Sequence, residues 1–285
     1  MQNLHYWSVL LVACLLSVGC QDDLERPPAF VTIEGFELNT PGIGGTTEAI
    51  SEVWVFTGNA YVGAFRLPAR IPIYDAVGVT QLRLQPGVRR NGISAQPEIY
   101  EFYTPAERVV ELRPGETIEL GTLPVTYRND VQFGFIESFE ENTSRVFIDP
   151  LQGNAALQAS DDNPRSGGFS GKLTLTADDP VVTLGTVQRY PNLLANRPLV
   201  WLEVDFRSDV PVVWGVAGTA SDGIPVQLAD PTSAPRNDWT KIYFDLTEIV
   251  NQANADPLQI FFSAGLPGGV EEADVFLDNI RLLYF

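Results

Sequence analysis

Short runs in which apolar and polar residues alternate recur along the chain from about residue 29 to its end. Pro and Gly, of which the chain holds 21 and 24, separate these runs. In "VWLEVDF" (200–206), for example, Val200, Leu202, Val204 and Phe206 share one face of a strand, whereas Trp201, Glu203 and Asp205 share the other. No sustained period of 3.6 residues competes with this pattern. The chain is therefore predicted to be an all-β protein.

The strand-like runs fall into two groups. The first group predicts an N-terminal β-sandwich of immunoglobulin or transthyretin type over residues 29–129. The second group predicts another sandwich over residues 130–285. Its six strand-bearing segments are 131–141, 166–180, 198–218, 238–250, 258–265 and 273–285.

Two strands of the second group allow inward and outward residues to be assigned. In "WTKIYFDL" (239–246), Ile242, Phe244 and Leu246 are expected to point into the sandwich, and Trp239, Lys241, Tyr243 and Asp245 away from it. In "VFLDNIRLL" (275–283), strict alternation places Phe276, Asp278, Ile280 and Leu282 on one face. Asp278 is therefore expected to point inward, where a carboxylate needs a cation or hydrogen-bond donors.

The first 28 residues have a different character. The apolar stretch 7–18 is too short to span a bilayer but fits the hydrophobic region of a secretory signal. Small residues and then Cys20 follow, which resembles the lipobox of bacterial lipoproteins and implies a signal peptide at 1–19 and acyl chains on Cys20. Acylation would anchor the protein in membrane lipid without a spanning segment. A buried N-terminal helix or strand is the alternative.

The linker at 20–28 carries an acidic cluster, "QDDLE", directly after this cysteine. Such a cluster resembles the surface-export signal of lipoproteins in the Bacteroidota. The resemblance implies an outer-membrane protein facing the cell exterior. A solvated linker is the alternative interpretation.

Composition removes several classes of function. The only histidine, His5, lies in the predicted signal peptide, so the mature chain lacks imidazole and, apart from Cys20, any thiol. Ser-His-Asp and Cys-His catalysis therefore have no basis. With 36 acidic against 18 basic residues, the net charge of −18 argues against nucleic-acid binding. A glycosidase needs only two carboxylates, but no pattern selects a pair, so we expect no enzyme.

Three motifs of the second group resemble the β-jelly-roll modules of the carbohydrate-binding and galactose-binding-like superfamily. They are "FE" at 139–140, "W-x-K-x-x-x-D-L" at 239–246 and "DNI" at 278–280. The resemblance implies a jelly roll that binds glycan. It also implies a structural Ca²⁺ held by Glu137 or Glu140 together with Asp278, for which the alternative is a carboxylate capped by backbone N–H groups.

The candidate glycan contacts are aromatic residues with acids beside them, which stack on sugar rings and accept hydrogen bonds from hydroxyls. They are Trp201, Glu203, Asp205, Trp214, Trp239 and Tyr243. Alternatively, these residues cover a second layer, a loop or the neighbouring domain. The loop at 84–94 adds the pair Arg89 and Arg90, which suits a carboxylate or phosphate but also a solvated turn.

Two functions follow for a lipid-anchored, non-enzymatic surface protein. The first is polysaccharide binding, which predicts an exposed aromatic strip. The second is an accessory subunit docked on an outer-membrane protein complex, which predicts packed Trp201, Trp214 and Trp239 and a flat apolar patch elsewhere.

Overall fold

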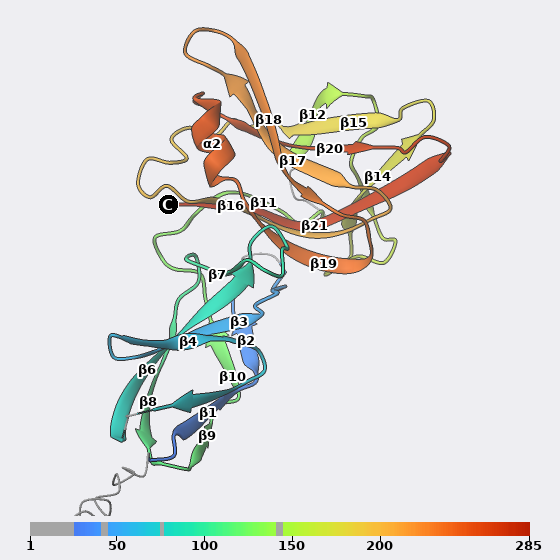
Figure 1. Ribbon diagram of the computed structural model, residues 1–285. Helices are drawn as coiled ribbons and strands as arrows, with labels where there is room; N and C mark the ends of the chain where they lie inside the picture. Colours follow the sequence, from blue (N-terminus) through green and yellow to red (C-terminus); the bar gives the residue numbers. More distant parts are fainter. Residues whose placement is uncertain (1–25, 41–44, 75–76, 141–144) are drawn as a thin grey trace, which may run out of the picture.

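The computed structural model describes residues 26–40, 45–74, 77–140 and 145–285 (Figure 1). The predicted signal peptide, Cys20 and the acidic cluster lie outside the described residues, so the lipoprotein assignment stays a prediction. Strands dominate the described chain, and the prediction of an all-β protein is confirmed. No helix in these ranges is long and apolar enough to cross a membrane.

The N-terminal domain consists of β1 to β10, which pair only with one another in its sheets. One layer contains the order β5-β1-β9 and the pair β10-β2, and the other contains β4-β3-β6-β7 with β8 beside β6. The strands are β1 (Ala29–Ile33), β2 (Gly35–Leu38), β3 (Glu52–Thr57), β4 (Ala60–Arg66), β5 (Ala69–Ile73), β6 (Gly78–Arg89), β7 (Pro97–Ile99), β8 (Ala106–Leu112), β9 (Thr117–Glu119) and β10 (Thr122–Val125).

Alternation along β3 explains how this sandwich closes. Val53 and Val55 are buried in its core, whereas the intervening Trp54 lies on the opposite face. The Trp54 ring covers Gly87 of the paired strand β6 so closely that a Cβ at that position would overlap it. A glycine is therefore required there for the aromatic ring to lie flat on the sheet.

The C-terminal domain is a sandwich of two antiparallel sheets. The first has the order β13-β14-β21-β16-β19, with β11 also paired to β21, and the second has the order β12-β15-β20-β17-β18. The elements are β11 (Gln132–Glu137), β12 (Phe147–Gln152), β13 (Gln158–Ser160), β14 (Ser170–Thr176), β15 (Val181–Thr186), β16 (Val200–Ser208), β17 (Val212–Thr219), β18 (Pro225–Ser233), β19 (Arg236–Asp245), α2 (Thr247–Ala253), β20 (Gln259–Gly265) and β21 (Glu272–Tyr284).

The core between these two sheets follows the predicted alternation in β16 and β19. It includes all the residues assigned inward there, namely Val200, Leu202, Val204, Phe206, Ile242, Phe244 and Leu246. Trp214 also lies in this core, with 1% of its surface exposed, against the rings of Phe147, Phe244 and Phe262.

The predicted faces of β21 are correct for Ile280 and Leu282 but wrong for Phe276 and Asp278, because the strand contains a bulge. Asn279 adopts a φ of 47°, and the register with β16 shifts between the pairs Glu203–Arg281 and Asp205–Asp278. Ile280 and Leu282 therefore point into the core as expected. Asp278, two residues earlier, pairs with Asp205 on the outer-face side of the shift.

The two domains meet on the outer face of the β16–β19–β21 sheet, near the β6–β7 end of the N-terminal domain (Figure 1). An isolated bridge joins Arg90 to Tyr243, and the amide of Asn91 donates to the carbonyl oxygen of Tyr243 at 2.9 Å. Trp201, Tyr243, Leu283 and Phe285 of the C-terminal domain belong to the N-terminal hydrophobic core.

Candidate functional site

The outer face of β16 and β19 carries four of the six predicted ligand residues. Trp201, Glu203, Asp205 and Tyr243 are all buried, with 3% of Trp201 and none of Glu203 exposed. The N-terminal domain covers them. The prediction that these side chains form an exposed sugar-binding strip is therefore wrong, and the alternative that the neighbouring domain covers them is correct.

Glu203 lies at the centre of the polar contacts between the domains. Its carboxylate accepts hydrogen bonds from the hydroxyls of Tyr100 at 2.8 Å and Tyr127 at 2.9 Å, both from the N-terminal domain. From its own sheet it receives the Lys241 Nζ at 3.2 Å and the Arg281 Nη1 at 3.2 Å. A buried carboxylate is thus surrounded by two cations and two hydroxyl donors.

These partners decide the charge state of the cluster. Burial alone would raise the pKa of Glu203, but Lys241, Arg281 and the two hydroxyls together hold it below its ordinary value. Burial, together with the charge of Glu203, raises the pKa of Tyr100 well above its ordinary value. Glu203 is therefore ionised at neutral pH and the tyrosine is a pure donor to it.

Asp205, two residues further along the same face of β16, is contacted by side chains from both domains. The hydroxyl of Thr47 in the N-terminal domain donates to it, Lys241 Nζ lies 3.7 Å away and Arg165 Nε lies 3.5 Å away. Arg281 in turn donates to the carbonyl oxygen of Gly45. The segment before β3 is therefore tied to the C-terminal sheet by side chains that carry charge.

Aromatic rings fill the rest of this joint. The ring of Tyr100 lies 5.3 Å from that of Trp201, 4.8 Å from that of Tyr243 and 4.7 Å from that of Tyr103, all in edge-to-face geometry. Such contacts add to the stability given by area burial alone. The face that sequence analysis assigned to a ligand holds the two domains together.

The two remaining predicted ligand residues are not part of this buried joint. Trp214 lies in the jelly-roll core and cannot contact a surface ligand. Trp239 is half-buried, its indole Nε1 donates to the carbonyl of Asn163 at 2.8 Å, and the guanidinium of Arg207 lies 5.7 Å from its ring. The structure therefore does not gather the six residues into one site.

Backbone N–H groups satisfy the carboxylates predicted to bind Ca²⁺. Glu137 accepts from the amides of Phe139 at 2.9 Å and Val146 at 2.8 Å. Glu140 accepts from the amides of Gly168 at 3.0 Å and Phe169 at 3.3 Å.

Asp278 accepts from the amides of Asn279 at 2.7 Å and Ser166 at 3.1 Å. Burial, with further contributions from Asp205 and Glu140, raises the pKa of Asp278 to about 7. Within the described ranges, no group of three or more His, Cys, Asp or Glu side chains is arranged to hold a metal ion. The donor set fits capping by amides better than a cation, and Ca²⁺ stays a prediction.

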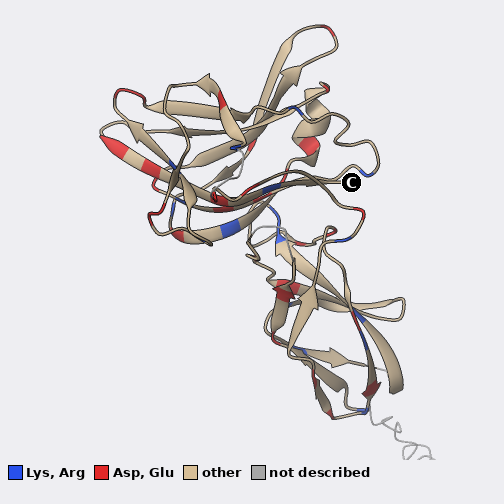
Figure 2. Ribbon diagram, turned by 180° about the vertical axis from the view of Figure 1, so that it is seen from behind, with Lys and Arg blue, Asp and Glu red and all other residues tan. Residues whose placement is uncertain are grey.

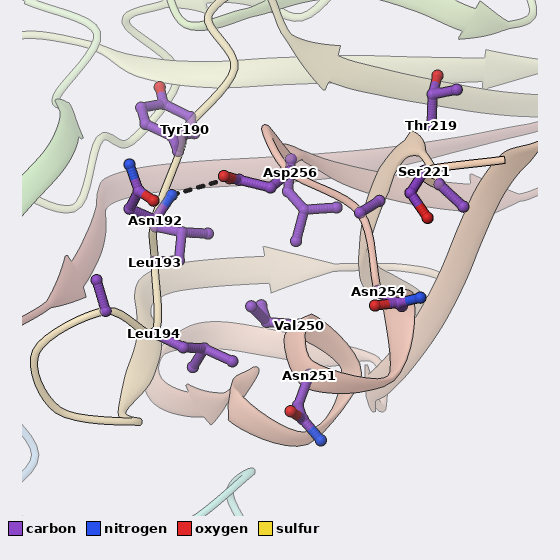
Figure 3. A pocket seen from close by; sticks show the side chains of 14 residues that line it. Tyr190, Asn192, Leu193, Leu194, Thr219, Ser221, Val250, Asn251, Asn254 and Asp256 are labelled. Carbon is purple, nitrogen blue, oxygen red and sulfur yellow. Dashed lines mark hydrogen bonds between the residues drawn. The ribbon is translucent and has the colours of Figure 1, made fainter. Parts of the chain in front are cut away.

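A pocket of about 610 Å³ opens in the C-terminal domain between α2, the segment before β16 and the β17–β18 turn (Figure 3). Its floor is apolar and buried, and consists of Tyr190, Leu193, Val250 and Leu258. Its exposed rim carries amides, hydroxyls and one carboxylate, contributed by Asn192, Thr219, Ser221, Asn251, Asn254 and Asp256.

Local structure holds this rim in place. Asp256 Oδ1 accepts the amide N–H of Asn192 at 2.8 Å, which fixes one side of the pocket to the loop after α2 (Figure 3). Asn192 and Asn254 both adopt left-handed backbone conformations, with φ of 56° and 45°, which asparagine tolerates better than most residues. Burial raises the pKa of Tyr190 to about 12, so its hydroxyl stays protonated.

The sequence pattern does not reveal this pocket. Its rim comes from loops and one helix, where no strand alternation applies, and its residues match no motif. The one available signal was the dense run of amides with one acid in "NQANAD" (251–256), which covers the last turn of α2 and the three residues after it.

No family model matches the chain, and no curated protein matches its sequence. The chain is similar in fold to several solved carbohydrate-binding modules. One is the CBM22-1 xylan-binding domain of Paenibacillus barcinonensis Xyn10C, with 13% identity over 54% of this chain and 94% of that domain, at a TM-score of 0.40.

Two further likenesses have similar values. A family 30 carbohydrate-binding module shows 12% identity over 55% of this chain and 89% of its own, at a TM-score of 0.42. A structure described as a carbohydrate-binding module of the β-sandwich superfamily shows 10% identity over 90% of this chain and 98% of its own, at a TM-score of 0.41.

Proposed function

We propose that this protein is a non-enzymatic glycan-binding protein whose C-terminal domain binds a neutral saccharide in the pocket beside α2. The observation that carries the proposal is the composition of that pocket, an apolar floor surrounded by amides, hydroxyls and a single carboxylate, Asp256. Amides and hydroxyls match the donors and acceptors of sugar hydroxyls, and an apolar floor matches the C–H faces of the ring. Its volume of about 610 Å³ lies in the range of small-ligand sites.

The arrangement of the domains supports a place at the cell surface. The described chain begins at the end of the N-terminal domain that lies farthest from the C-terminal domain (Figure 1). If Cys20 is acylated as predicted, the N-terminal domain stands next to the outer membrane and the domain that holds the pocket lies farther from it. Polysaccharide outside the cell then has direct access to the jelly roll.

Docking on an outer-membrane protein complex is the second candidate. Burial of Trp201 and Trp214 agrees with that alternative, although the cover is the protein's own N-terminal domain and core. The apolar side chains of Val79 on β6 and Val109 on β8 are 78% and 70% exposed and lie on neighbouring strands. These two residues offer a small apolar surface for a partner.

A glycan-array screen of the soluble chain from Gln21 onward tests the proposal, followed by calorimetry with the saccharides that bind. The double variant Asn251→Ala/Ser221→Ala removes two rim groups and should weaken binding about tenfold or more. Gln252→Ala is the matched control, because this exposed residue is adjacent on α2 but does not line the pocket.

Equal affinity of the double variant and the unaltered protein would exclude this pocket as the site. Absence of binding to every polysaccharide, together with co-purification of an outer-membrane protein that Val79→Asp releases, would favour the docking alternative.

A further inference from the structure

A second pocket, of about 470 Å³, lies between the two domains. The N-terminal domain contributes Ala49–Ser51, Arg66, Leu67, Arg89, Gly92 and Ser94, and the C-terminal domain contributes Arg236 and the segment Thr240–Tyr243. Figure 2 shows Lys and Arg positions on both sides of this junction. Three guanidinium groups from three different strands therefore line one hollow.

The positive charge of this interdomain pocket is only partly neutralised. Arg89 pairs with Glu52 at 3.3 Å and donates to the Ser94 hydroxyl at 3.2 Å. Arg66 and Arg236 are exposed, and neither has a carboxylate within 4.0 Å among the described residues. In a chain with twice as many acids as bases, two unpaired arginines in one pocket oppose the average charge of the protein.

Lys241 contributes the pocket wall rather than free charge. Its ammonium is bound by Glu203 at 3.2 Å and Asp205 at 3.7 Å, and only 1% of its side chain is exposed. The net excess of positive charge therefore resides on Arg66 and Arg236, while Arg89 adds N–H donors from a guanidinium already paired with Glu52. Arginine is the side chain best suited to bind carboxylate or sulfate oxygens in pairs.

The rest of the lining is suited to more than a bare ion. Ile50, Leu67 and Ile242 give apolar contact, whereas Ser51, Ser94 and Thr240 offer hydroxyls. A free inorganic anion needs neither an apolar wall nor a volume of about 470 Å³. A sugar ring that bears an acidic group uses all three kinds of surface.

We propose that the interdomain pocket binds an acidic saccharide unit, a uronic acid or a sulfated sugar, through Arg66, Arg89 and Arg236. The ligand would contact both domains at once. This site shares no residue with the pocket beside α2, so it stands or falls independently of neutral-glycan binding there.

An NMR chemical-shift titration of the purified full chain tests the proposal with three probes. D-glucuronate carries a carboxylate at the carbon where D-glucose carries a hydroxymethyl group, and the two sugars are otherwise the same. Inorganic phosphate supplies a free oxyanion. We expect glucuronate to bind at least about tenfold more tightly than glucose, with an affinity that falls as salt is added.

Variants assign the binding to the arginines. Arg66→Ala/Arg236→Ala should weaken glucuronate binding about tenfold or more, since the loss of one charge-assisted contact alone contributes about that factor. Arg66→Lys/Arg236→Lys keeps the charge but loses the paired geometry and should give an intermediate affinity. Arg26→Ala is the control, because Arg26 is exposed and lies outside the pocket.

Three results would overturn the proposal. They are no glucuronate binding, glucuronate binding that Arg66→Ala/Arg236→Ala leaves unchanged, and phosphate binding as tight as that of glucuronate with mutual competition. The last result would make the pocket a site for free anions. Because both arginines are exposed, an unchanged melting temperature should confirm that the variants fold.

Discussion

Between Val200 and Phe206, both faces of β16 are buried, but by different means. The inner face consists of Val200, Leu202, Val204 and Phe206 on β16, and it packs against the second sheet of the sandwich. The outer face of the same strand presents Glu203 and Asp205 to the N-terminal domain. Burial can therefore rest on apolar contact on one side of a strand and on neutralised charge on the other.

The difference matters because the two means respond differently to change. An apolar side chain that is shortened loses contact area and leaves a cavity, which the surroundings partly fill. A buried charge that loses its partner leaves the other charge without compensation. The outer face is therefore the more sensitive to single substitutions, although it includes polar residues that resemble a surface.

The largest expected effect is that of Glu203→Ala. Removing this carboxylate leaves Lys241 and Arg281 facing each other in a buried joint and should lower the free energy of unfolding by about 3–5 kcal/mol. Urea denaturation monitored by tryptophan fluorescence measures it. Leu202→Ala, on the inner face one residue earlier, is expected to cost about 2–5 kcal/mol. A loss below about 1 kcal/mol for Glu203→Ala would show that the ion cluster does not hold the joint.

Asp278 tests whether a carboxylate near the bulge behaves unlike Glu203. Its pKa of about 7 in the folded protein lies above its ordinary 3.8, so the folded state binds the proton more tightly than the unfolded state. The stability that Asp278 contributes is therefore fully present below about pH 4 and is lost as the pH rises through about 7. The difference corresponds to about 4 kcal/mol at most.

The measurement compares the free energy of unfolding at about pH 5 and about pH 8 for the unaltered protein and for Asp278→Asn. The variant cannot titrate, so its stability should fall less between these two conditions. An identical pH dependence of both proteins would contradict the raised pKa. Addition of Ca²⁺ at about pH 8 provides a further comparison, since a bound cation would stabilise the unaltered protein alone.

Tyr100→Phe should have a smaller effect. It removes one hydroxyl at 2.8 Å from Glu203 while the two cations and Tyr127 remain, so we expect a loss of about 1.5–3 kcal/mol. Tyr61→Phe, at an exposed position on β4, is the control and should leave the urea midpoint unchanged. Equal midpoints for both variants would mean that Glu203 does not need this donor.

Arg113→Ala is expected to have the smallest effect of the series. Arg113 pairs with Glu111 at 3.2 Å, but both side chains are 59% exposed on the N-terminal domain. Water and salt screen such a pair, so the thermal midpoint should not change beyond the error of calorimetry. A clear drop would show that geometry alone, without burial, gives ion pairs their importance in this protein.

Alternation predicted much of the fold and little of the candidate sites. It assigned inner and outer residues correctly along β16 and β19. These two strands pair without a register shift from Trp201 to Phe206 on β16 and from Asp245 to Thr240 on β19. It failed on β21, where Asn279 inserts a bulge that a period of two residues cannot reveal.

The sites were harder to predict for a different reason. Alternation shows that Trp201 and Tyr243 leave the jelly-roll core, but it cannot show that Tyr100 and Tyr103, far away in sequence, cover them. The pocket beside α2 and the interdomain pocket both combine loops with elements distant along the chain. Such combinations depend on tertiary contacts, which periodicity in one strand does not contain.

The shared membership of Trp201, Tyr243, Leu283 and Phe285 in the neighbouring domain's core has a practical consequence for dissecting the molecule. A fragment that begins after residue 129 would expose these rings and leave Glu203 without its tyrosine donors. Such an excised module would be prone to aggregation, and its exposed ion cluster would lack part of its hydrogen-bond partners. Lectin assays performed on it would then record artefacts of the cut surface, so the intact pair is the unit to purify.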